Sequence, residues 1–187
     1  DVAYGKGKFV AIANSSNAVA VGSYNATTTL WTWTSSVVEV QDSSPEDWSS
    51  IVYGNGRFVT VSTSGDVSYS FDGLQWYTTS AGMPQPSATE MYWKQIRYGQ
   101  GVFFAVCETS TAGPTTFAAT SYDGIVWTSR TLTESHRWGV IGFGNPDVTL
   151  GDSTVSNNQP MWIAAPTTSS SDINRIFTGA RTLGRAV

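Results

Sequence analysis

A tryptophan that recurs every 45 residues constrains the fold of this chain more strongly than any other feature. The recurring tryptophans are Trp48, Trp93 and Trp138. Five residues after each of them comes an aromatic-glycine pair, and these pairs are Tyr53-Gly54, Tyr98-Gly99 and Phe143-Gly144. A fixed period of this length indicates repeated structural units that bury their apolar faces against one another.

The clearest unit, residues 48–76, is predicted to contain four short strands. Its β-rich runs are separated by three groups of turn residues: Gly54-Asn55-Gly56, Ser64-Gly65-Asp66 and Asp72-Gly73. An Asp-Gly pair between two such runs is among the strongest sequence signals for a β-hairpin. Because every turn is short, consecutive strands must pair in opposite directions. The unit is therefore predicted to be an antiparallel meander.

Repeats of about 40 to 50 residues with four strands each are typical of β-propeller blades. We divide the single repeat region, residues 1–187, into units of about 1–47, 48–92, 93–137 and 138–187. The predicted fold class is all-β, a β-propeller with about four four-stranded antiparallel blades. Because the first and last units are incomplete, we expect a fragment of a longer chain that forms part of a larger propeller or array.

The first and last units depart from the pattern. Unit one has no opening tryptophan and no Asp-Gly turn, although Trp31 and Trp33 lie near the expected closing position. Unit four carries an insertion, residues 145–160, where the other units have a short turn. Insertions in hairpin turns cost little closure entropy and are a usual place for function to be added. The insertion is therefore a candidate functional loop.

The charge and hydropathy of the chain exclude two classes of partner. Its 10 Lys and Arg residues are spread singly, and its formal net charge is −4. Phosphate binding needs a clustered basic face, so no nucleic-acid partner is expected. No apolar stretch approaches the roughly 20 residues that span a bilayer, so no membrane insertion is expected.

No catalytic residue, cofactor or metal site is predicted. His136 is the only histidine and Cys107 the only cysteine, which is too few for a transition-metal site or a Ser-His-Asp triad. The acidic stretch 42–47 lacks the spacing of a recognised calcium loop. The scattered acids, including those of this stretch, are interpreted as solvated charges, mostly in connectors. The acids so interpreted are Glu39, Asp42, Glu46, Asp47, Glu90, Glu108 and Glu134.

The motif Ser70-Phe71-Asp72-Gly73-Leu74-Gln75-Trp76, repeated at residues 121–127, resembles the Asp-box of sialidase-like propellers. The family pattern S-x-D-x-G-x-x-W has one more residue between Asp and Gly. The resemblance implies that the aspartates cap their turns with side-chain-to-backbone hydrogen bonds and that the tryptophans pack between blades. The implied structural residues are Ser70, Asp72, Gly73, Trp76, Ser121, Asp123, Gly124 and Trp127.

The combined pattern of Tyr-Gly-x-Gly hairpin and Asp-Gly-x-x-Trp closing turn also resembles repeats in structural and tail proteins of tailed bacteriophages and some bacterial surface proteins. This resemblance implies a non-enzymatic component of a tail, baseplate or fibre on the virion. A bacterial cell surface or a secreted location is the alternative. The implied partners are other virion or appendage subunits and a host surface polysaccharide.

The aromatic residues fall into two groups. Those at the common phase, Trp48, Trp93 and Trp138, are predicted to pack between blades. Four others are interpreted as loop aromatics that contact glycan: Trp31, Trp33, Tyr77 and Tyr92. A glycan-degrading enzyme on a sialidase-like scaffold remains the alternative, and it would need two facing carboxylates. Its sialidase version also needs an Arg-Ile-Pro motif, whereas Arg175-Ile176-Phe177 lacks the proline. A purely architectural module is the third interpretation.

Overall fold

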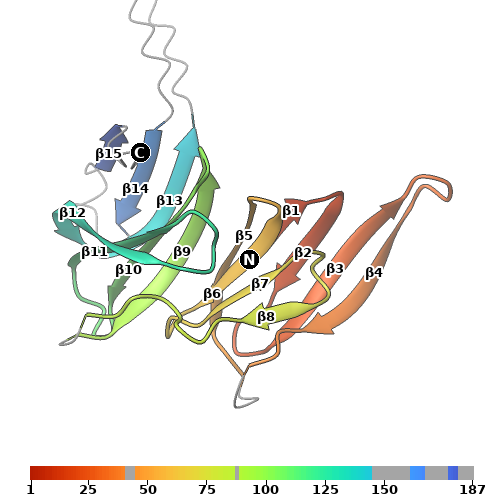
Figure 1. Ribbon diagram of the computed structural model, residues 1–187, viewed down its shortest axis with the longest axis horizontal. Helices are drawn as coiled ribbons and strands as arrows, with labels where there is room; N and C mark the ends of the chain where they lie inside the picture. Colours follow the sequence, from red (N-terminus) through yellow and green to blue (C-terminus); the bar gives the residue numbers. More distant parts are fainter. Residues whose placement is uncertain (41–44, 87–88, 145–160, 167–176, 181–187) are drawn as a thin grey trace, which may run out of the picture.

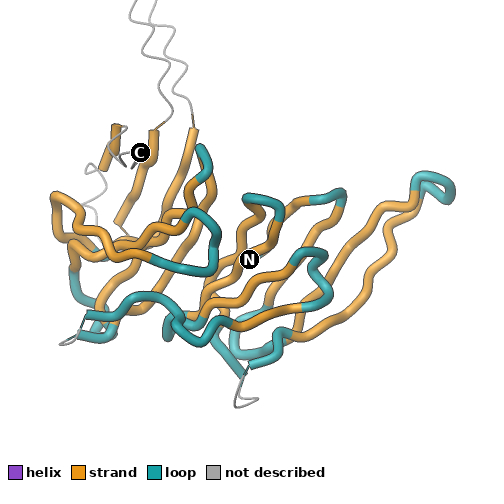
Figure 2. The backbone as a smooth tube through the Cα atoms, viewed as in Figure 1, coloured by secondary structure: helices purple, strands orange, loops and turns teal. Residues whose placement is uncertain are grey.

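The computed structural model describes residues 1–40, 45–86, 89–144, 161–166 and 177–180. Every regular element in these residues is a β-strand, as the strand-coloured tube of Figure 2 shows. The described residues contain no helix that is long and apolar enough to cross a membrane. The all-β prediction is confirmed.

The strands form four antiparallel sheets, which we call blades 1 to 4. Blade 1 contains β1 (Val2–Gly5), β2 (Lys8–Ile12), β3 (Ala18–Asn25) and β4 (Leu30–Val37). Blade 2 contains β5 (Trp48–Gly54), β6 (Arg57–Ser62), β7 (Val67–Ser70) and β8 (Trp76–Thr78). Blade 3 contains β9 (Met91–Gly99), β10 (Val102–Thr109), β11 (Thr115–Ser121) and β12 (Thr128–His136). The described strands of blade 4 are β13 (Trp138–Gly144), β14 (Met161–Pro166) and β15 (Phe177–Ala180).

The blades follow one another in chain order, with blade 1 at one end of the molecule and blade 4 towards the other (Figure 1). Neighbouring blades meet through their first strands: β1 contacts β5, β5 contacts β9, and β9 contacts β13. Within blades 1 to 3 the strand order puts the fourth strand at the outer edge of the sheet. This radial arrangement is that of a β-propeller, so the predicted architecture of about four blades is also confirmed.

Each blade has two faces with different side chains, because strand residues alternate between the faces. We call the face that carries Tyr4, Tyr53, Tyr98 or Phe143 the front face. The opposite face, which carries Val10, Val59, Phe104 or Ile163, is the back face. Cross-strand pairing repeats on every front face, where the first-strand aromatic lies opposite a second-strand aromatic. The two rings of each pair lie 4.6–4.9 Å apart between centroids.

Three buried apolar clusters lie between neighbouring blades. In the first cluster, Val10 and Val21 on the back of blade 1 pack with Phe58 and Trp76 of blade 2. The second cluster joins the valines on the back of blade 2 to blade 3, and the third joins the back of blade 3 to blade 4. The propeller core is therefore divided into inter-blade layers, each made of one back face and the next front face.

In blades 1 to 3, a glycine at the end of the first strand receives an aromatic ring from the next blade. The pairs are Tyr53 on Gly5, Tyr98 on Gly54 and Phe143 on Gly99. A Cβ atom at any of these glycines would lie only 2.1–2.3 Å from the ring, closer than real Cβ atoms approach. The aromatic-glycine pair of the sequence repeat is therefore a joint between blades, in which the ring of one blade sits on the glycine of the blade before it.

One hydrogen bond between blades also recurs at a fixed position. The backbone amides of Ile51, Ile96 and Ile141 each donate to a side-chain oxygen of the preceding blade. The acceptors are Asp1 Oδ2, Ser50 Oγ and Gln95 Oε1, respectively. Each joint thus combines a ring-on-glycine contact with one directional polar contact, which fixes the register of neighbouring blades.

Candidate binding site

The Asp-Gly turn of blade 2 is held by a set of short-range hydrogen bonds. Asp72 Oδ1 accepts from the backbone amides of Leu74 and Gln75 at 2.8 and 2.9 Å. Ser70 Oγ accepts from the Gly73 amide at 2.8 Å, and Trp76 Nε1 donates to the Gly73 carbonyl at 3.0 Å. The amides of Gln75 and Leu74 hold the pKa of Asp72 below its ordinary value. The Asp72 carboxylate therefore stabilises the turn.

The turn of blade 3 repeats the aspartate and serine hydrogen bonds, although Trp127 Nε1 has no hydrogen-bond partner among the described residues. Asp123 Oδ1 accepts from the amides of Ile125 and Val126, and Ser121 Oγ accepts from the Gly124 amide. Burial opposes ionisation of Asp123, but hydrogen bonds from Val126 and Ile125 outweigh it and lower the pKa. Trp127 belongs to the buried cluster between blades 2 and 3.

The turn glycines also contact the preceding blade. Gly73 and Gly124 have φ of +81° and +74°, a conformation in which side chains are strained. A Cβ atom at Gly73 would lie 2.6 Å from Val10, and one at Gly124 would lie 2.5 Å from Val59. Each turn thus packs its glycine against the back face of the blade before it.

The three tryptophans at the common phase are buried between blades. Trp48 and Trp138 donate their indole N–H groups to Asn17 Oδ1 and the Thr115 carbonyl. Trp93 is completely buried in the cluster between blades 2 and 3, and its Nε1 has no hydrogen-bond partner there. None of the three presents a ring to solvent.

The prediction that the four glycan-contacting aromatics lie in loops is wrong, because all four lie in strands. Trp31 and Trp33 are in β4, Tyr77 is in β8 and Tyr92 is in β9. Strands rich in Ser and Thr resemble loops in composition, which is why the sequence suggested loops. Trp31, Trp33 and Tyr77 are exposed, and they belong to two different blades. Tyr92, in blade 3, lies under the Lys94 ammonium group at 5.9 Å from the ring centroid.

One of these aromatics, Tyr77, lines a cleft between the outer strands of blades 1 and 2. This outer cleft has a volume of about 380 Å³ and is lined by Ser36, Val37, Glu39, Leu74, Gln75, Trp76 and Tyr77. Two hydrogen bonds join its walls. The Ser36 hydroxyl donates to the Leu74 carbonyl, and the Thr78 hydroxyl donates to the Glu39 carbonyl. Because both blades build the walls, the cleft depends on the packing of blade 1 against blade 2.

The outer cleft combines a few polar groups with apolar surface. Glu39 supplies the one carboxylate among its described lining residues, and Gln75 supplies an amide. Leu74 supplies apolar surface beside them, whereas the ring of Tyr77 stacks on Tyr69 on the back face of blade 2. Small-molecule sites have this composition, with a few placed polar groups in a mainly apolar lining. Sequence reasoning missed Glu39 and Gln75 as site residues, because Glu39 belongs to no motif, Gln75 is a variable position of the closing motif, and their proximity requires two blades.

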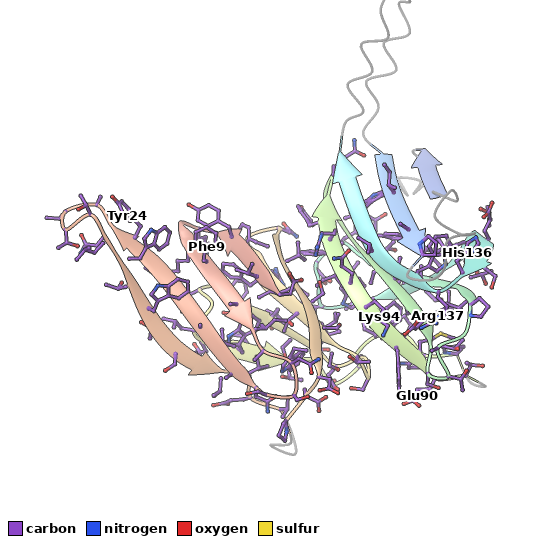
Figure 3. The ribbon with its side chains drawn as sticks, turned by 180° about the vertical axis from the view of Figure 1, so that it is seen from behind. Phe9, Tyr24, Glu90, Lys94, His136 and Arg137 are labelled. Atoms are coloured by element: carbon purple, nitrogen blue, oxygen red, sulfur yellow. The ribbon has the colours of Figure 1, made fainter. Side chains whose placement is uncertain are left out.

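Glu108 is not a solvated connector residue, contrary to the prediction. It is a buried residue of β10, with its carboxylate 2.7 Å from Lys94 Nζ and 2.9 Å from Arg137 Nε. Figure 3 shows Lys94 and Arg137 close together in blade 3. Burial opposes ionisation of Glu108, but the hydrogen bonds and charges of Lys94 and Arg137 outweigh it and lower the pKa. This ion pair network is structural and leaves no free carboxylate.

Neither Cys107 nor His136 is placed for chemistry. Cys107 is buried in β10, and burial, with the nearby Glu108 charge, raises its thiol pKa to about 12. His136 ends β12 rather than lying in a connector, and its ring contacts Glu134 at 3.0 Å. Within the described residues, no group of three or more His, Cys, Asp and Glu side chains is placed to hold a metal ion.

Three stretches that the sequence singled out lie wholly or partly outside the described residues. They are the acidic stretch 42–47, the insertion 145–160 and the segment 175–177. The described part of the acidic stretch includes Asp47, whose carboxylate accepts a hydrogen bond from Ser15 Oγ at 2.7 Å.

These features define the class of protein: a β-propeller whose blades are joined by aromatic-glycine contacts. The fold is similar to that of a solved structure of YCF48 from Cyanidioschyzon merolae, with a TM-score of 0.50 and 12% sequence identity. The match covers 96% of this chain and 57% of that one. A structure of YCF48 bound to D1 peptide also matches, with a TM-score of 0.43 and 12% identity, over 95% of this chain and 66% of that one.

The first likeness supports the β-propeller fold and, at 12% identity, the fold alone. This chain spans little more than half the length of that structure. No family model and no curated protein sequence matches the chain.

Proposed function

We propose that this chain is a non-enzymatic component of a virion or cell-surface appendage, of the tail, baseplate or fibre type. In this proposal it binds a surface polysaccharide through the outer cleft and assembles with other appendage subunits. Its place is extracellular, on the virion, with a bacterial surface or secretion as the alternative. The observation that carries the proposal is the outer cleft, where Leu74, Gln75 and Glu39 come together.

The chemistry of the outer cleft suits a sugar. A sugar ring offers hydroxyl groups that need hydrogen-bond partners and C–H faces that pack on aromatic or aliphatic side chains. Gln75 both donates and accepts hydrogen bonds, the Glu39 carboxylate accepts them, and Leu74 supplies an aliphatic surface. A neutral or weakly basic glycan fits this lining better than an acidic one, because the described charge in the cleft is negative.

The closing turns support the assignment of blades 2 and 3 to the Asp-box type. In both turns the aspartate accepts two backbone amides and the serine accepts the glycine amide. The tryptophan that follows is buried between blades in both. These are the roles that the resemblance implies, in a turn one residue shorter than the family pattern. The resemblance to tailed-phage repeats, which points to a virion, rests on the sequence pattern alone.

The proposal is tested by measuring binding of the 187-residue chain to an array of bacterial surface polysaccharides. For a polysaccharide that binds, Leu74→Ala and Gln75→Ala should each weaken binding about tenfold or more, equivalent to about 1.4 kcal/mol. Tyr122→Ala is the matched control, because Tyr122 is exposed in the closing turn of blade 3, away from the outer cleft. Binding that the cleft variants leave unchanged, or no binding to any polysaccharide, would overturn glycan recognition by this cleft.

The same preparation separates the proposal from the enzymatic alternative. A glycan-degrading enzyme would release reducing sugar from a bound polysaccharide during prolonged incubation. A binding module leaves the polysaccharide intact, so the reducing-end concentration should stay constant. Steady release that Glu39→Gln abolishes would replace the binding proposal with hydrolysis.

A further inference from the structure

The front face of blade 1 is a large exposed apolar surface. Its exposed apolar residues are Val2, Tyr4, Phe9, Tyr24, Trp31, Trp33 and Val37. The strand registers place them on one face: Tyr4 lies opposite Phe9, Phe9 opposite Gly22, and Gly22 opposite Trp33. Figure 3 shows Phe9 and Tyr24 on blade 1, at the end of the molecule away from Lys94 and Arg137. Contiguous apolar surfaces of this kind usually mark interaction sites.

The corresponding residues of the other blades are covered. Phe58 of blade 2 and Phe103 of blade 3 are completely buried, whereas Phe9 of blade 1 is 37% exposed. Tyr53 and Tyr98 sit on glycines of the preceding blade, whereas Tyr4 is 58% exposed. The front face of blade 1 thus has the side chains of an inter-blade joint without the back face that completes one.

The back face of blade 4 is the converse case. Gly144 corresponds to Gly5, Gly54 and Gly99, yet a Cβ atom at Gly144 would meet nothing within 4 Å among the described residues. Ile163 is 37% exposed, whereas Val10 at the same position of blade 1 is completely buried. Among the described residues, this face therefore has an open glycine and the exposed aliphatic side chains of Val140 and Ile163, where an aromatic front face would fit.

We propose that the front face of blade 1 docks on the back face of blade 4 of a second copy of this chain. In this joint Tyr4 sits on Gly144 and Phe9 packs beside Ile163, as the equivalent residues do at the internal joints. For the 187-residue chain, two such joints used reciprocally would close a ring of two copies with eight blades, within the range of about 4 to 8 blades found in propellers. The inference extends the assembly part of the proposed function and does not depend on glycan binding.

The repeated hydrogen bond between blades identifies a copy of this chain as the fitting occupant. At the internal joints the acceptor side chain comes from the residue just before Val2, Ile51 or Ile96. In blade 4 the corresponding residue is Val140, which cannot accept a hydrogen bond. A front face like that of blade 2 or 3 would therefore bury an unpaired amide against blade 4, at a cost of about 1–3 kcal/mol.

Blade 1 avoids this cost. At its front face the corresponding donor is the Val2 amide, which already donates to Asp1 Oδ1 at 2.9 Å. A joint between Val2 of one copy and Val140 of another therefore leaves this donor paired and brings two exposed valines together. The two open faces match each other in polar as well as apolar groups.

The test is sedimentation of the full 187-residue chain and its variants. The chain should sediment as an assembly of two copies, about 40 kDa, twice the 20.1 kDa of one copy. Gly144→Leu should shift it to a single copy, because the new side chain occupies the space meant for Tyr4. The double variant Tyr4→Ser, Phe9→Ser should do the same from the other face. Tyr122→Ser, which removes a similarly exposed ring from a closing turn, should leave the assembly unchanged.

Mixing the two disrupted variants tests the head-to-tail geometry. The Gly144→Leu chain keeps an intact front face, and the Tyr4→Ser, Phe9→Ser chain keeps an intact back face. An equal mixture should therefore recover a two-copy species that neither variant forms alone. A wild-type chain of 20.1 kDa at all concentrations would overturn the proposal, as would an assembly that Gly144→Leu leaves intact or a mixture that stays dissociated.

Glycan binding by the dissociated variants separates this inference from the proposed function. Gly144 and Phe9 are not among the residues that line the outer cleft. Single-copy variants should therefore bind polysaccharide with unchanged intrinsic affinity, and circular dichroism should show the wild-type spectrum and melting temperature range. Failure of assembly with retained glycan binding would overturn this inference alone, whereas assembly without glycan binding would overturn glycan recognition alone.

Discussion

Blades 1 and 2 carry the same kind of aromatic pair, but another blade covers the pair of blade 2, whereas that of blade 1 is exposed. Tyr53 and Phe58 of blade 2 lie at 4.9 Å between ring centroids, and Tyr4 and Phe9 of blade 1 lie at 4.8 Å. Phe58 is completely buried against blade 1, whereas Phe9 is exposed. Cross-strand pairing within the blade therefore sets the geometry of the aromatic pair. How much the pair stabilises the fold depends on whether the back face of a neighbouring blade covers it.

This comparison makes the internal joints the main source of stability and the open faces the main source of interaction. An aromatic side chain stabilises the fold when its burial removes apolar surface from water. The same side chain on an open face contributes little to folding and remains available to a partner. Matched substitutions at internal and open positions should therefore differ in unfolding free energy by amounts that follow burial.

The largest difference is expected between Trp93 and Trp33. Trp93→Ala removes a fully buried ring between blades 2 and 3 and should lower the free energy of unfolding by about 3–5 kcal/mol. Trp33→Ala removes a ring that is 61% exposed on the front face of blade 1 and should change it by less than about 1 kcal/mol. Urea titration followed by tyrosine and tryptophan fluorescence measures both. Equal losses would mean that burial between blades does not govern stability.

A smaller difference is expected between two glycines at equivalent positions. Gly54→Ala places a methyl group 2.2 Å from the Tyr98 ring, so the ring must move and stability should fall by about 1–3 kcal/mol. Gly144→Ala meets no atom within 4 Å and should be neutral or stabilising by up to about 1 kcal/mol, because alanine suits a strand better than glycine. Both values come from thermal and urea unfolding at a concentration where the chain is a single copy. A neutral Gly54→Ala would contradict the ring-on-glycine joint.

The smallest difference concerns the hairpin tips of blades 1 and 2. The tip of blade 2 is held by the Asp72 carboxylate, whereas Asn25 Oδ1 accepts the amides of Thr27 and Thr28 in blade 1. Because the pKa of Asp72 is lower in the folded state, its contribution is present above the unfolded value of about 3.8 and is lost as pH falls through the folded value. Neutral Asn25 has no such dependence.

Replacing Asp72 with an uncharged residue tests this contrast. Asp72→Ala should cost on the order of 1 kcal/mol at pH 7, and the difference from wild type should shrink below about pH 4. Asn25→Ala should cost a similar amount at both pH values. Urea unfolding at pH 7 and pH 3 gives the four free-energy differences. A cost for Asp72→Ala that is the same at both values would show that the charge of its carboxylate plays no part.

The sequence was informative where the repeat determines the structure. The intervals between Trp48, Trp93 and Trp138 and the Asp-Gly pairs were enough to predict the four-strand repeat and the propeller architecture. These features depend on neighbours in the same unit or at a fixed distance in the next, so one sequence contains their signal. The recurring tryptophans Trp48, Trp93 and Trp138 also identified residues that pack against the preceding blade.

Features that depend on contacts outside the repeated motifs could not be predicted. The burial of Glu108 depends on Lys94 across a strand pair and on Arg137 from the end of the unit, and the β10–β9 pairing changes register between Val106 and Cys107. The outer cleft likewise requires two blades. The closing motif does not reveal it, because only the packing of β4 beside β8 gives Glu39 and Gln75 a common surface.

The most direct test of the central claim, that the two open faces are halves of one joint, is a disulfide cross-link between copies. At the internal joint, a Cβ atom at Gly54 would lie 2.7 Å from Tyr98 Cβ, so cysteines at the equivalent positions of two docked copies should lie within bonding reach. Cys107 should not interfere, because its thiol is buried and has a pKa of about 12. A mixture of Tyr4→Cys and Gly144→Cys chains should form a disulfide-linked pair of about 40 kDa under mild oxidation, and Tyr122→Cys mixed with Gly144→Cys should not. Absence of the first cross-link, or equal yields in the two mixtures, would contradict the claim.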